Sequence, residues 1–356
     1  MNCYFLCATQ PSNVGDLLIN KMLVDELCKY GTVYVDCYNI PDTFKCYILE
    51  NDNAVDVYEM SGFSVKKGDI ISFCFFLLRN NIKYFTQSPG PLGKLSKSYS
   101  LYFKLISYLL KSIKIKYCLI GNCCSNSLVS NEKISIRNAD IYLVRSGASL
   151  QYLSKCGIKN VHYIPDLAFL YREKALIIDS HKIVTFCFRE IYSNYDSFVE
   201  WLKRIIRLLH DKGYRIEFIY QVAKDKDFFI KIKNDLSGIT DNISFIENII
   251  WYDNIQYYSG KSIIISNRLH SLLLGVIHNA VPLALCYNDA RDVKILDVYN
   301  SVFKDLSTEL IVSADSVDKI EKILSNIDCV KDEIIKIADC NSKMCHQIIN
   351  KLCHSI

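Results

Sequence analysis

The fold class is decided by residues 263–286, which read IIISNRLHSLLLGVIHNAVPLALC. An apolar run opens this stretch, a polar turn and an apolar helical segment come next, and a second apolar run closes it, which predicts a β-α-β unit of a parallel sheet. Arg268 and His270 then lie just after the carboxyl end of a strand, the edge at which ligands bind in open α/β sheets. Because the start of the next helix favours an anion, we expect a phosphate or a carboxylate there.

The composition indicates a globular protein of two domains. The chain has 356 residues, more than one hydrophobic core usually holds. Half of the residues are apolar, 22% are charged, and Gly and Pro are few, which excludes disordered and fibrous classes. The net charge of +4 is small and no long run of one sign occurs, so we expect no nucleic acid partner.

The sixteen cysteines indicate buried reduced thiols. No C-x-x-C pair occurs, and neither the adjacent Cys123 and Cys124 nor the Cys-His pairs at 345 and 353 have the usual spacing of zinc ligands, so we expect no metal. Residues 1–7 lack a positive flank and a long apolar core, which predicts a first strand rather than a signal peptide, and a cytoplasmic location. The cysteines inside apolar runs are Cys3, Cys7, Cys74, Cys118, Cys187 and Cys286.

Apolar runs alternate with helical stretches in both halves of the chain, which predicts two Rossmann-like, doubly wound parallel sheets. We expect an N-terminal domain at 1–172 and a C-terminal domain at 173–356, with a charged linker at 171–182. The final helical region, 316–353, is long enough to pack back onto the first domain. Helices of the second half are expected at 193–212 and 225–236. The strands are expected at 3–8, 32–35, 70–76, 84–86, 117–120, 141–144, 161–164, 183–188, 216–220, 243–245, 263–265 and 282–285.

Distinctive polar residues fall just after strands, where parallel strands share an edge. Two sheets with functional carboxyl edges are most simply placed facing a central cleft, as in a two-domain transferase. Other interpretations remain open: Asp16 could cap a helix with Gly15 in the turn, the arginines could be surface or ion-pair residues, and His270 could be structural. Besides Arg268 and His270, the residues concerned are Asn13, Gly15, Asp16, Arg145, Asp166 and Arg189.

Residues 94–116 form a basic amphipathic segment without an acid. Two interpretations are open: a helix packed on the sheet with its lysines reaching solvent, or a helix that rests on an anionic membrane surface or a lipid-linked substrate. The sequence contains no run of about eighteen apolar residues, so we expect no transmembrane helix. The lysines are Lys94, Lys97, Lys104, Lys111, Lys114 and Lys116.

Four blocks of the chain, in collinear order, resemble the polysaccharide pyruvyl transferase family. Residues 12–19 look like its Asn-x-Gly-Asp opening, and residues 87–92 are similar to its Gln-x-x-Gly-Pro turn. Residues 144–169 resemble its Arg…Ser…Leu…Gly…Pro-Asp-x-Ala-Phe order. The fourth block resembles its Arg-Leu-His signature and the positions after it, and consists of Arg268, Leu269 and His270 with Val281, Pro282 and Tyr287.

The chain departs from the family's pattern in two places. The family usually has a Gly-rich turn after the strand expected at 70–76, whereas this chain continues with residues 75–80, FFLLRN. The family's lysine soon after the tyrosine is matched by Arg291 or Lys294 only after a shift.

The resemblance implies a GT-B-like transferase that moves pyruvate from phosphoenolpyruvate onto two hydroxyls of one sugar. The product is a ketal on a cell-surface polysaccharide, such as an exopolysaccharide, capsule or O-antigen, or on its lipid-linked precursor. The first domain is expected to take the acceptor and the second the donor, without metal or organic cofactor. Contact with the inner face of the membrane is a further expectation.

The resemblance also assigns roles to residues. Arg189 and Arg268 are the expected clamps for phosphoenolpyruvate, since a guanidinium binds oxyanions in bidentate fashion. His270 is expected to act as acid and base or to hold the phosphate, and Asp16 to take a proton from an acceptor hydroxyl. Two alternatives remain: a GT-B-like glycosyltransferase using a nucleotide sugar, and a glycan-binding protein without catalysis. Further substrate-binding residues are expected to be Arg145, Asn13, Gly15, Asp166 and Leu269.

Overall fold

The computed structural model describes residues 1–92, 97–124, 128–179, 181–191, 194–287, 292–313 and 316–354. Contacts within the chain divide it into two compact units. The first unit comprises Met1–Pro11, Asp16–Leu167 and Met344–Ile356, and the second comprises Ser12–Gly15 and Ala168–Lys343. Each contains a parallel sheet, so the predicted class of two Rossmann-like α/β domains is confirmed.

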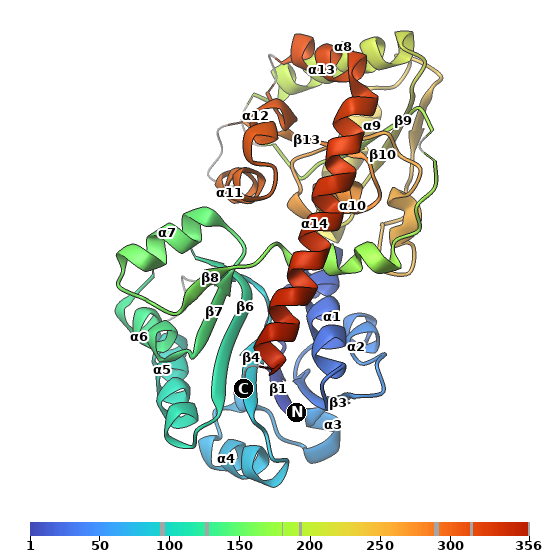
Figure 1. The fold of residues 1–356 in the computed structure, drawn as a ribbon. Coiled ribbons are helices and arrows are strands. Elements are labelled where there is room, and N and C mark those ends of the chain that lie inside the picture. Colours follow the sequence, from blue (N-terminus) through green and yellow to red (C-terminus); the bar gives the residue numbers. More distant parts are fainter. Residues whose placement is uncertain are drawn as a thin grey trace. The chain divides into compact units, whose positions relative to one another are not determined.

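The first unit is built on a parallel sheet with the strand order β3-β2-β1-β4-β6-β7-β8, and β5 pairs with β6. Helices α1 and α2 cover one face of this sheet, and α5, α6 and α7 cover the other (Figure 1). The strands are β1 (Cys3–Leu6), β2 (Val33–Asp36), β3 (Ala54–Asp56), β4 (Tyr84–Gln87), β5 (Gly90–Leu92), β6 (Lys116–Cys124), β7 (Ile141–Val144) and β8 (Val161–Tyr163). The helices are α1 (Val14–Cys28), α2 (Asp42–Ile48), α3 (Val57–Ser61), α4 (Ile70–Arg79), α5 (Lys97–Ser112), α6 (Ser130–Asn138) and α7 (Gly147–Lys155), with 3-10 helices η1 (Val65–Lys67) and η2 (Leu167–Lys174).

The second unit is built on a parallel sheet with the order β11-β10-β9-β12-β13-β14. Its strands are β9 (Ile183–Cys187), β10 (Arg215–Ile219), β11 (Ile243–Phe245), β12 (Ile263–Ser266), β13 (Val281–Leu285) and β14 (Ile311–Val312). Its helices are α8 (Tyr195–Asp211), α9 (Lys226–Asp235), α10 (Leu269–Ile277), α11 (Val293–Val302), α12 (Ser307–Leu310) and α13 (Val317–Ser325), with 3-10 helices η3 (Ala223–Asp225), η4 (Ile255–Tyr258) and η5 (Lys304–Leu306). The last helix, α14 (Ile327–His354), begins in this unit and ends in the first.

Burial explains why the apolar runs form strands and why the amphipathic segments form helices. Every residue of β9, β12 and β13 is buried, as expected for strands covered on both faces of a parallel sheet. On α8, Phe198, Leu202, Ile205 and Leu209 recur every three or four residues and are all buried, so one face of the helix packs against the core. The strands expected at 141–144 and 243–245 have the observed bounds, and most others differ by one to three residues at an end.

One expected strand is wrong: residues 70–76 lie in helix α4. Asp69 caps this helix, because its side chain accepts a hydrogen bond from the Ser72 N–H. Phe73, Phe76 and Leu77 are buried at helical spacing. The outward face of α4 is apolar as well, so the segment shows no amphipathic pattern, and a short continuous apolar run can be a strand or a helix.

Smaller differences concern short elements. The linker expected at 171–182 begins inside η2, which continues to Lys174. The short strands β3, β5 and β14 were not expected, and residues 94–96 of the basic segment lie outside the described residues. The cysteines expected to be buried are buried or half-buried, and none of the sixteen forms a disulfide.

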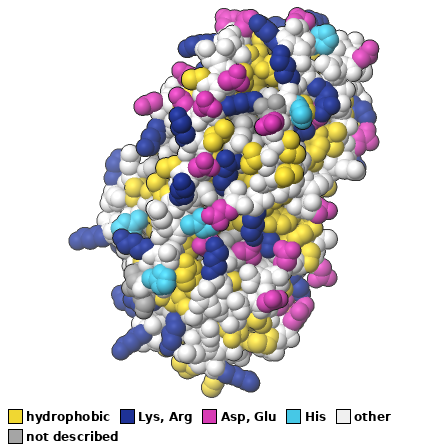
Figure 2. Space-filling model, turned by 45° about the vertical axis from the view of Figure 1, so that its right-hand side comes forward, with side chains coloured by type: hydrophobic (Ala, Val, Ile, Leu, Met, Phe, Trp, Pro, Cys, Tyr) yellow, Lys and Arg dark blue, Asp and Glu magenta, His cyan; other side chains and the backbone are white. Residues whose placement is uncertain are grey.

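Charged side chains of both signs are interspersed with hydrophobic ones over the upper and middle part of the face shown in Figure 2. This mixture agrees with the small net charge of +4. Among the described residues, no helix is both long enough and apolar enough to cross a bilayer.

We predict that Gly275→Val destabilises the second unit by about 1–3 kcal/mol, the usual cost of overpacking a core. A Cβ at Gly275 would lie 2.5 Å from Cγ1 of Ile264, so α10 packs against β12 without room for a side chain. Urea unfolding followed by tryptophan fluorescence would measure the change, since the only tryptophans, Trp201 and Trp251, belong to this unit. The control Lys322→Val, at an exposed position of α13, should stay within about 0.5 kcal/mol. Equal stability of both variants would contradict the packing argument.

Candidate functional site

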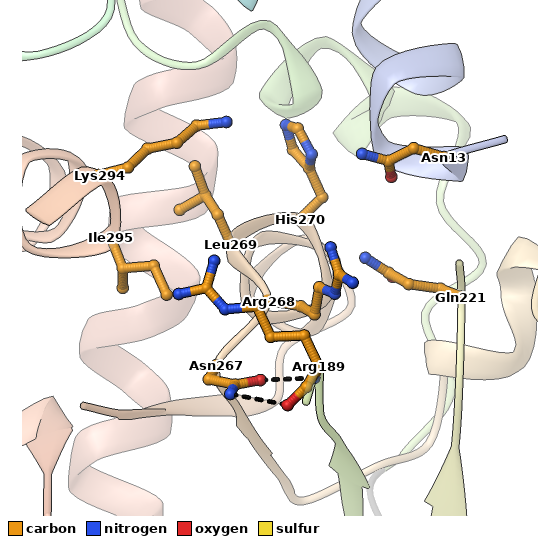
Figure 3. A pocket seen from close by; sticks show the side chains of 9 residues that line it. All are labelled: Asn13, Arg189, Gln221, Asn267, Arg268, Leu269, His270, Lys294 and Ile295. Carbon is orange, nitrogen blue, oxygen red and sulfur yellow. Dashed lines mark hydrogen bonds between the residues drawn. The ribbon is translucent and has the colours of Figure 1, made fainter. Parts of the chain in front are cut away.

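A pocket in the second unit lies at the carboxyl ends of its central strands. Arg189 follows β9, Gln221 follows β10, and Asn267 follows β12. Asn13 joins them because Ser12–Gly15 belongs to this unit, where Asn13 forms an antiparallel bridge with Val222. Nine residues line the pocket (Figure 3): Asn13, Arg189, Gln221, Asn267, Arg268, Leu269, His270, Lys294 and Ile295.

Arg268 occupies the turn between β12 and α10 and is the residue just before the helix. Its backbone N–H donates to the Ser266 hydroxyl at 2.9 Å, and its guanidinium forms an ion pair with Asp225 of η3. Burial raises the pKa of the Asp225 carboxyl, while the Arg268 charge opposes that rise. The Arg268 side chain keeps 14% of its surface exposed, so it is held from one side and open on another.

Arg189 is fixed through both its backbone and its side chain. Its N–H donates to Oδ1 of Asn267 at 2.8 Å, and its carbonyl accepts from Nδ2 of Asn267 at 3.1 Å (Figure 3). These two bonds tie the end of β9 to the end of β12. The guanidinium lies 3.2 Å from Asp292, and 18% of the side chain is exposed.

The amides of Asn13 and Gln221 present their nitrogen ends to the pocket (Figure 3). Oδ1 of Asn13 accepts from the Gly15 N–H at 3.0 Å, which caps the start of α1. Oε1 of Gln221 accepts from the Tyr258 hydroxyl at 2.9 Å. Since both amide oxygens are engaged elsewhere, the NH₂ groups are the parts that a ligand would meet.

His270 lies in the first turn of α10 and is 4% exposed. Gly15 packs directly against its ring: a Cβ at Gly15 would lie 2.1 Å from Nδ1 of His270. Only glycine therefore fits at position 15 while the ring keeps this place. The interpretation of Gly15 as a turn residue is replaced by a packing reason, and the cap of α1 is Asn13, whereas Asp16 lies within the first turn.

Two further candidates, Arg145 and Asp166, lie in the first unit and bind each other. Nη1 of Arg145 is 2.6 Å from Oδ2 of Asp166, and the two side chains are 1% and 0% exposed. Nη2 of Arg145 also contacts the Cys123 sulfur at 3.7 Å. This buried pair has a structural role in its unit, and contact of either residue with a substrate stays a prediction.

Sequence reasoning missed part of the pocket. Gln221 could have been found, since it follows a strand of the same sheet edge. Asp225 and Asp292 could not, because they come from η3 and from the residue before α11, and only the folded chain brings them to the arginines. Lys294 lines the pocket, and Arg291 lies outside the described residues.

The arrangement suits an anion. Two guanidiniums, a lysine and two amide NH₂ groups line the pocket, and the first turn of α10 adds the N–H groups that every helix start leaves unbonded. The carboxylates of Asp225 and Asp292 form ion pairs with the two arginines and are not among the residues that line the pocket. Among the described residues, no three His, Cys, Asp or Glu side chains gather as a metal site requires.

Comparisons with known proteins agree on the fold. A family model described as polysaccharide pyruvyl transferase matches residues 13–289. The sequence matches no curated protein.

Among solved structures, the fold is similar to UDP-GlcNAc 2-epimerase from Neisseria meningitidis bound to UDP-GlcNAc (TM-score 0.62, 13% identity, 99% of each chain covered). It is also similar to a glycosyltransferase from Rickettsia africae (TM-score 0.63, 11% identity, 99% of this chain and 98% of that one). The Anabaena protein HepE in complex with UDP and glucose is a third case (TM-score 0.62, 9% identity, 100% of both chains). At these identities the likeness shows the GT-B fold alone.

We predict that inorganic phosphate stabilises the second unit through the pocket. A ligand present at ten times its dissociation constant raises the free energy of unfolding by about 1.4 kcal/mol. For a unit of this size, that corresponds to a rise in Tm of about 3–6 °C. Thermal unfolding followed by tryptophan fluorescence, with sodium chloride at equal ionic strength as reference, would measure the shift.

The shift should vanish in the double variant Arg268→Gln/Asp225→Asn, which replaces the ion pair by two neutral groups and leaves no buried charge alone. Lys322→Gln/Lys336→Gln removes two exposed charges outside the pocket and should keep the shift. A phosphate effect that survives in the Arg268→Gln/Asp225→Asn protein would place the anion elsewhere.

Proposed function

This chain belongs to the polysaccharide pyruvyl transferase family, and on that premise we propose that it transfers pyruvate from phosphoenolpyruvate to a sugar, forming a cyclic ketal. The acceptor is a cell-surface polysaccharide, such as an exopolysaccharide, a capsule or an O-antigen, or its lipid-linked precursor. The reaction takes place in the cytoplasm. It requires no metal and no organic cofactor, because phosphoenolpyruvate is itself the activated donor.

The observation that carries this proposal is the lining of the pocket by two guanidiniums, a lysine and two amide NH₂ groups. Phosphoenolpyruvate has two oxyanion groups, a carboxylate and a phosphate, and the pocket holds two separate guanidiniums. Arg268 and Arg189 are each fixed by their own carboxylate, Asp225 and Asp292, and keep an exposed edge. A guanidinium that is oriented by an ion pair on one side presents its remaining N–H groups in a fixed geometry. This geometry favours bidentate binding of an oxyanion.

The chemistry balances without a further reactant. Protonation of the methylene carbon makes carbon 2 electrophilic, and a first sugar hydroxyl adds there with loss of its proton. The bond from carbon 2 to the phosphate oxygen then breaks, and phosphate leaves with the electron pair. A second hydroxyl adds to carbon 2 and closes the ketal. Two protons are released from the two hydroxyls. One restores the group that protonated the methylene carbon, and the other leaves with the phosphate.

The residues divide this work by their chemistry. Arg189 and Arg268 neutralise the charge on the departing phosphate, which stabilises the transition state. His270, beside Arg268, delivers the proton to the methylene carbon or holds the phosphate. Asp16 takes a proton from an acceptor hydroxyl. Leu269, Asn13, Gly15, Arg145 and Asp166 are assigned to shaping or contacting the substrate sites.

Lys294 supports the donor assignment, since it lines the pocket with Arg189 and Arg268 and adds a third cation for an anionic donor. A glycan-binding protein without catalysis is distinguished from the transferase by assay, because it would bind glycan but release no phosphate from phosphoenolpyruvate. A nucleotide-sugar donor remains the second candidate, because its diphosphate could engage the same two arginines, and the fold is similar to proteins solved with UDP.

We predict that the purified protein releases phosphate from phosphoenolpyruvate when an acceptor glycan is present. Synthetic and lipid-linked glycans would be incubated with phosphoenolpyruvate, and the products analysed by mass spectrometry. The expected product is the glycan plus pyruvate minus water. Gain of a sugar from a nucleotide sugar, with phosphoenolpyruvate left intact, would establish the second candidate instead.

We predict that Gly15→Ala inactivates the enzyme by displacing His270. His270→Ala sets the benchmark, with an expected loss of about 10²- to 10⁴-fold in kcat if the imidazole transfers a proton. Gly15→Ala should approach that loss while KM for phosphoenolpyruvate changes less. Alanine favours a helix by about 1 kcal/mol over glycine, so the variant should remain folded. Ser12→Ala, at an exposed neighbouring position, is the control, and normal turnover of Gly15→Ala would show that the ring moves without consequence.

A further inference from the structure

The outer face of α4 is apolar. Ile71, Phe75 and Leu78 are 71%, 71% and 66% exposed, and their spacing of four and three residues puts them on one side of the helix. The opposite side, with Phe73 and Phe76, is buried in the core of the first unit. The helix therefore has an apolar face toward the core and a second one toward solvent.

Helix α5 repeats this arrangement. Leu101, Leu105 and Tyr108 are 47%, 48% and 50% exposed at the same helical spacing. Its buried side belongs to the same core cluster as that of α4. The Tyr102 hydroxyl donates to the carbonyl of Val65, in the turn that leads into α4, at 2.6 Å, so the two helices cover neighbouring parts of one sheet face.

We define the α4–α5 surface by these six exposed side chains: Ile71, Phe75, Leu78, Leu101, Leu105 and Tyr108. Exposed aliphatic and aromatic residues scattered singly are normal on a soluble protein, but two sets at helical spacing, on two helices that share one core cluster, are not. The surface needs an occupant.

The charge of this segment identifies the occupant. Residues 70–131 contain no aspartate and no glutamate, although the chain has 38 acidic residues. Arg79 and Lys83 lie in or after the end of α4, and Lys111 and Lys116 lie near the end of α5. All four are exposed.

These basic residues meet at one place in the fold. The connections from α4 to β4 and from α5 to β6 end at adjacent strands, where the Lys116 N–H donates to the Lys83 carbonyl at 2.9 Å. Asp140 lies 3.8 Å from Lys116 and offsets one of the charges. The basic cluster thus lies at the amino edge of the sheet, opposite the carboxyl edge where the polar site candidates of this unit follow their strands.

We propose that the α4–α5 surface docks onto an anionic lipid bilayer. Apolar side chains beside lysine and arginine, in a stretch whose nearest acids are the α4 cap Asp69 and Glu132, match an interfacial helix: the apolar residues enter the acyl boundary while the basic ones contact anionic headgroups. Helix α5 has 16 residues and one face committed to the core, so it lies in the interface and does not cross it. The protein then binds the membrane by its first unit and leaves the carboxyl edge of that sheet free.

Co-sedimentation of the full chain with vesicles tests this. The protein should bind vesicles of phosphatidylcholine mixed with phosphatidylglycerol, bind phosphatidylcholine alone much more weakly, and dissociate as sodium chloride rises. Absence of binding to the anionic vesicles at low salt overturns the proposal. The assay needs no acceptor and no phosphoenolpyruvate, so its outcome is independent of the proposed activity.

Variants assign the binding to residues. Ile71→Gln/Phe75→Gln/Leu78→Gln should lower the partition coefficient at least about tenfold, since burial of three apolar side chains is lost. Lys83→Gln/Lys111→Gln should lower it about fivefold per lysine. All changed side chains are exposed, so circular dichroism and thermal unfolding should be unchanged.

The matched controls lie in the second unit. Ile177→Gln/Ile178→Gln/Ile230→Gln replaces three exposed apolar residues, and Lys322→Gln/Lys336→Gln removes two exposed charges. Both controls should bind anionic vesicles as the wild type does. Equal losses in the controls would overturn the assignment. So would a dimer in sedimentation velocity that the α4 triple variant abolishes, since the surface would then belong to a second copy of the chain.

Discussion

The pocket depends on a simple electrostatic constraint: a guanidinium that is largely buried needs a counter-ion, and the place of that counter-ion decides what the arginine can still do. Removing one partner from such a pair leaves an uncompensated charge, which costs more than the pair contributes. Arg268 and Arg189 meet their carboxylates, Asp225 and Asp292, at one side, and 14% and 18% of their side chains remain exposed. Asn267 holds the two arginine-bearing strand ends together through the main chain of Arg189.

Arg145 shows the other outcome of the same constraint. It also follows a strand of a parallel sheet, but it is 1% exposed and its two Nη atoms contact Asp166 and Cys123. The rule that ligands bind at the carboxyl edge of a parallel sheet agrees with the position of the pocket in the second unit. It does not say whether a side chain turns outward or becomes part of the core, because that depends on which carboxylate the fold brings near. Sequence spacing carries no such information.

The fold itself was largely predictable, since the apolar runs and the polar turn of residues 263–286 predict almost the whole β-α-β unit. The two sheets and most strands follow from apolar runs buried on both faces. The exception is informative: α4 was expected to be a strand because Ile71, Phe75 and Leu78 are apolar although exposed. When both sides of a helix are apolar, its sequence lacks the 3.6-residue hydrophobic periodicity from which an amphipathic helix is predicted. The exposed apolar side of α4, which led to the wrong prediction of a strand, is therefore part of the α4–α5 surface for which we propose a binding partner.

The two motifs that lie farthest apart in the sequence form one structural arrangement. Asn13 uses its carbonyl oxygen to cap α1 and thereby turns its NH₂ group toward the pocket, and Gly15 leaves the space that His270 fills. A residue with a Cβ at position 15 would push the imidazole away from the first turn of α10, where the helix start and the arginines create the positive potential. Glycine in the Asn-x-Gly-Asp opening and histidine in the Arg-Leu-His turn are thus constrained by each other. A change at one position that keeps the site must keep the shape of the other.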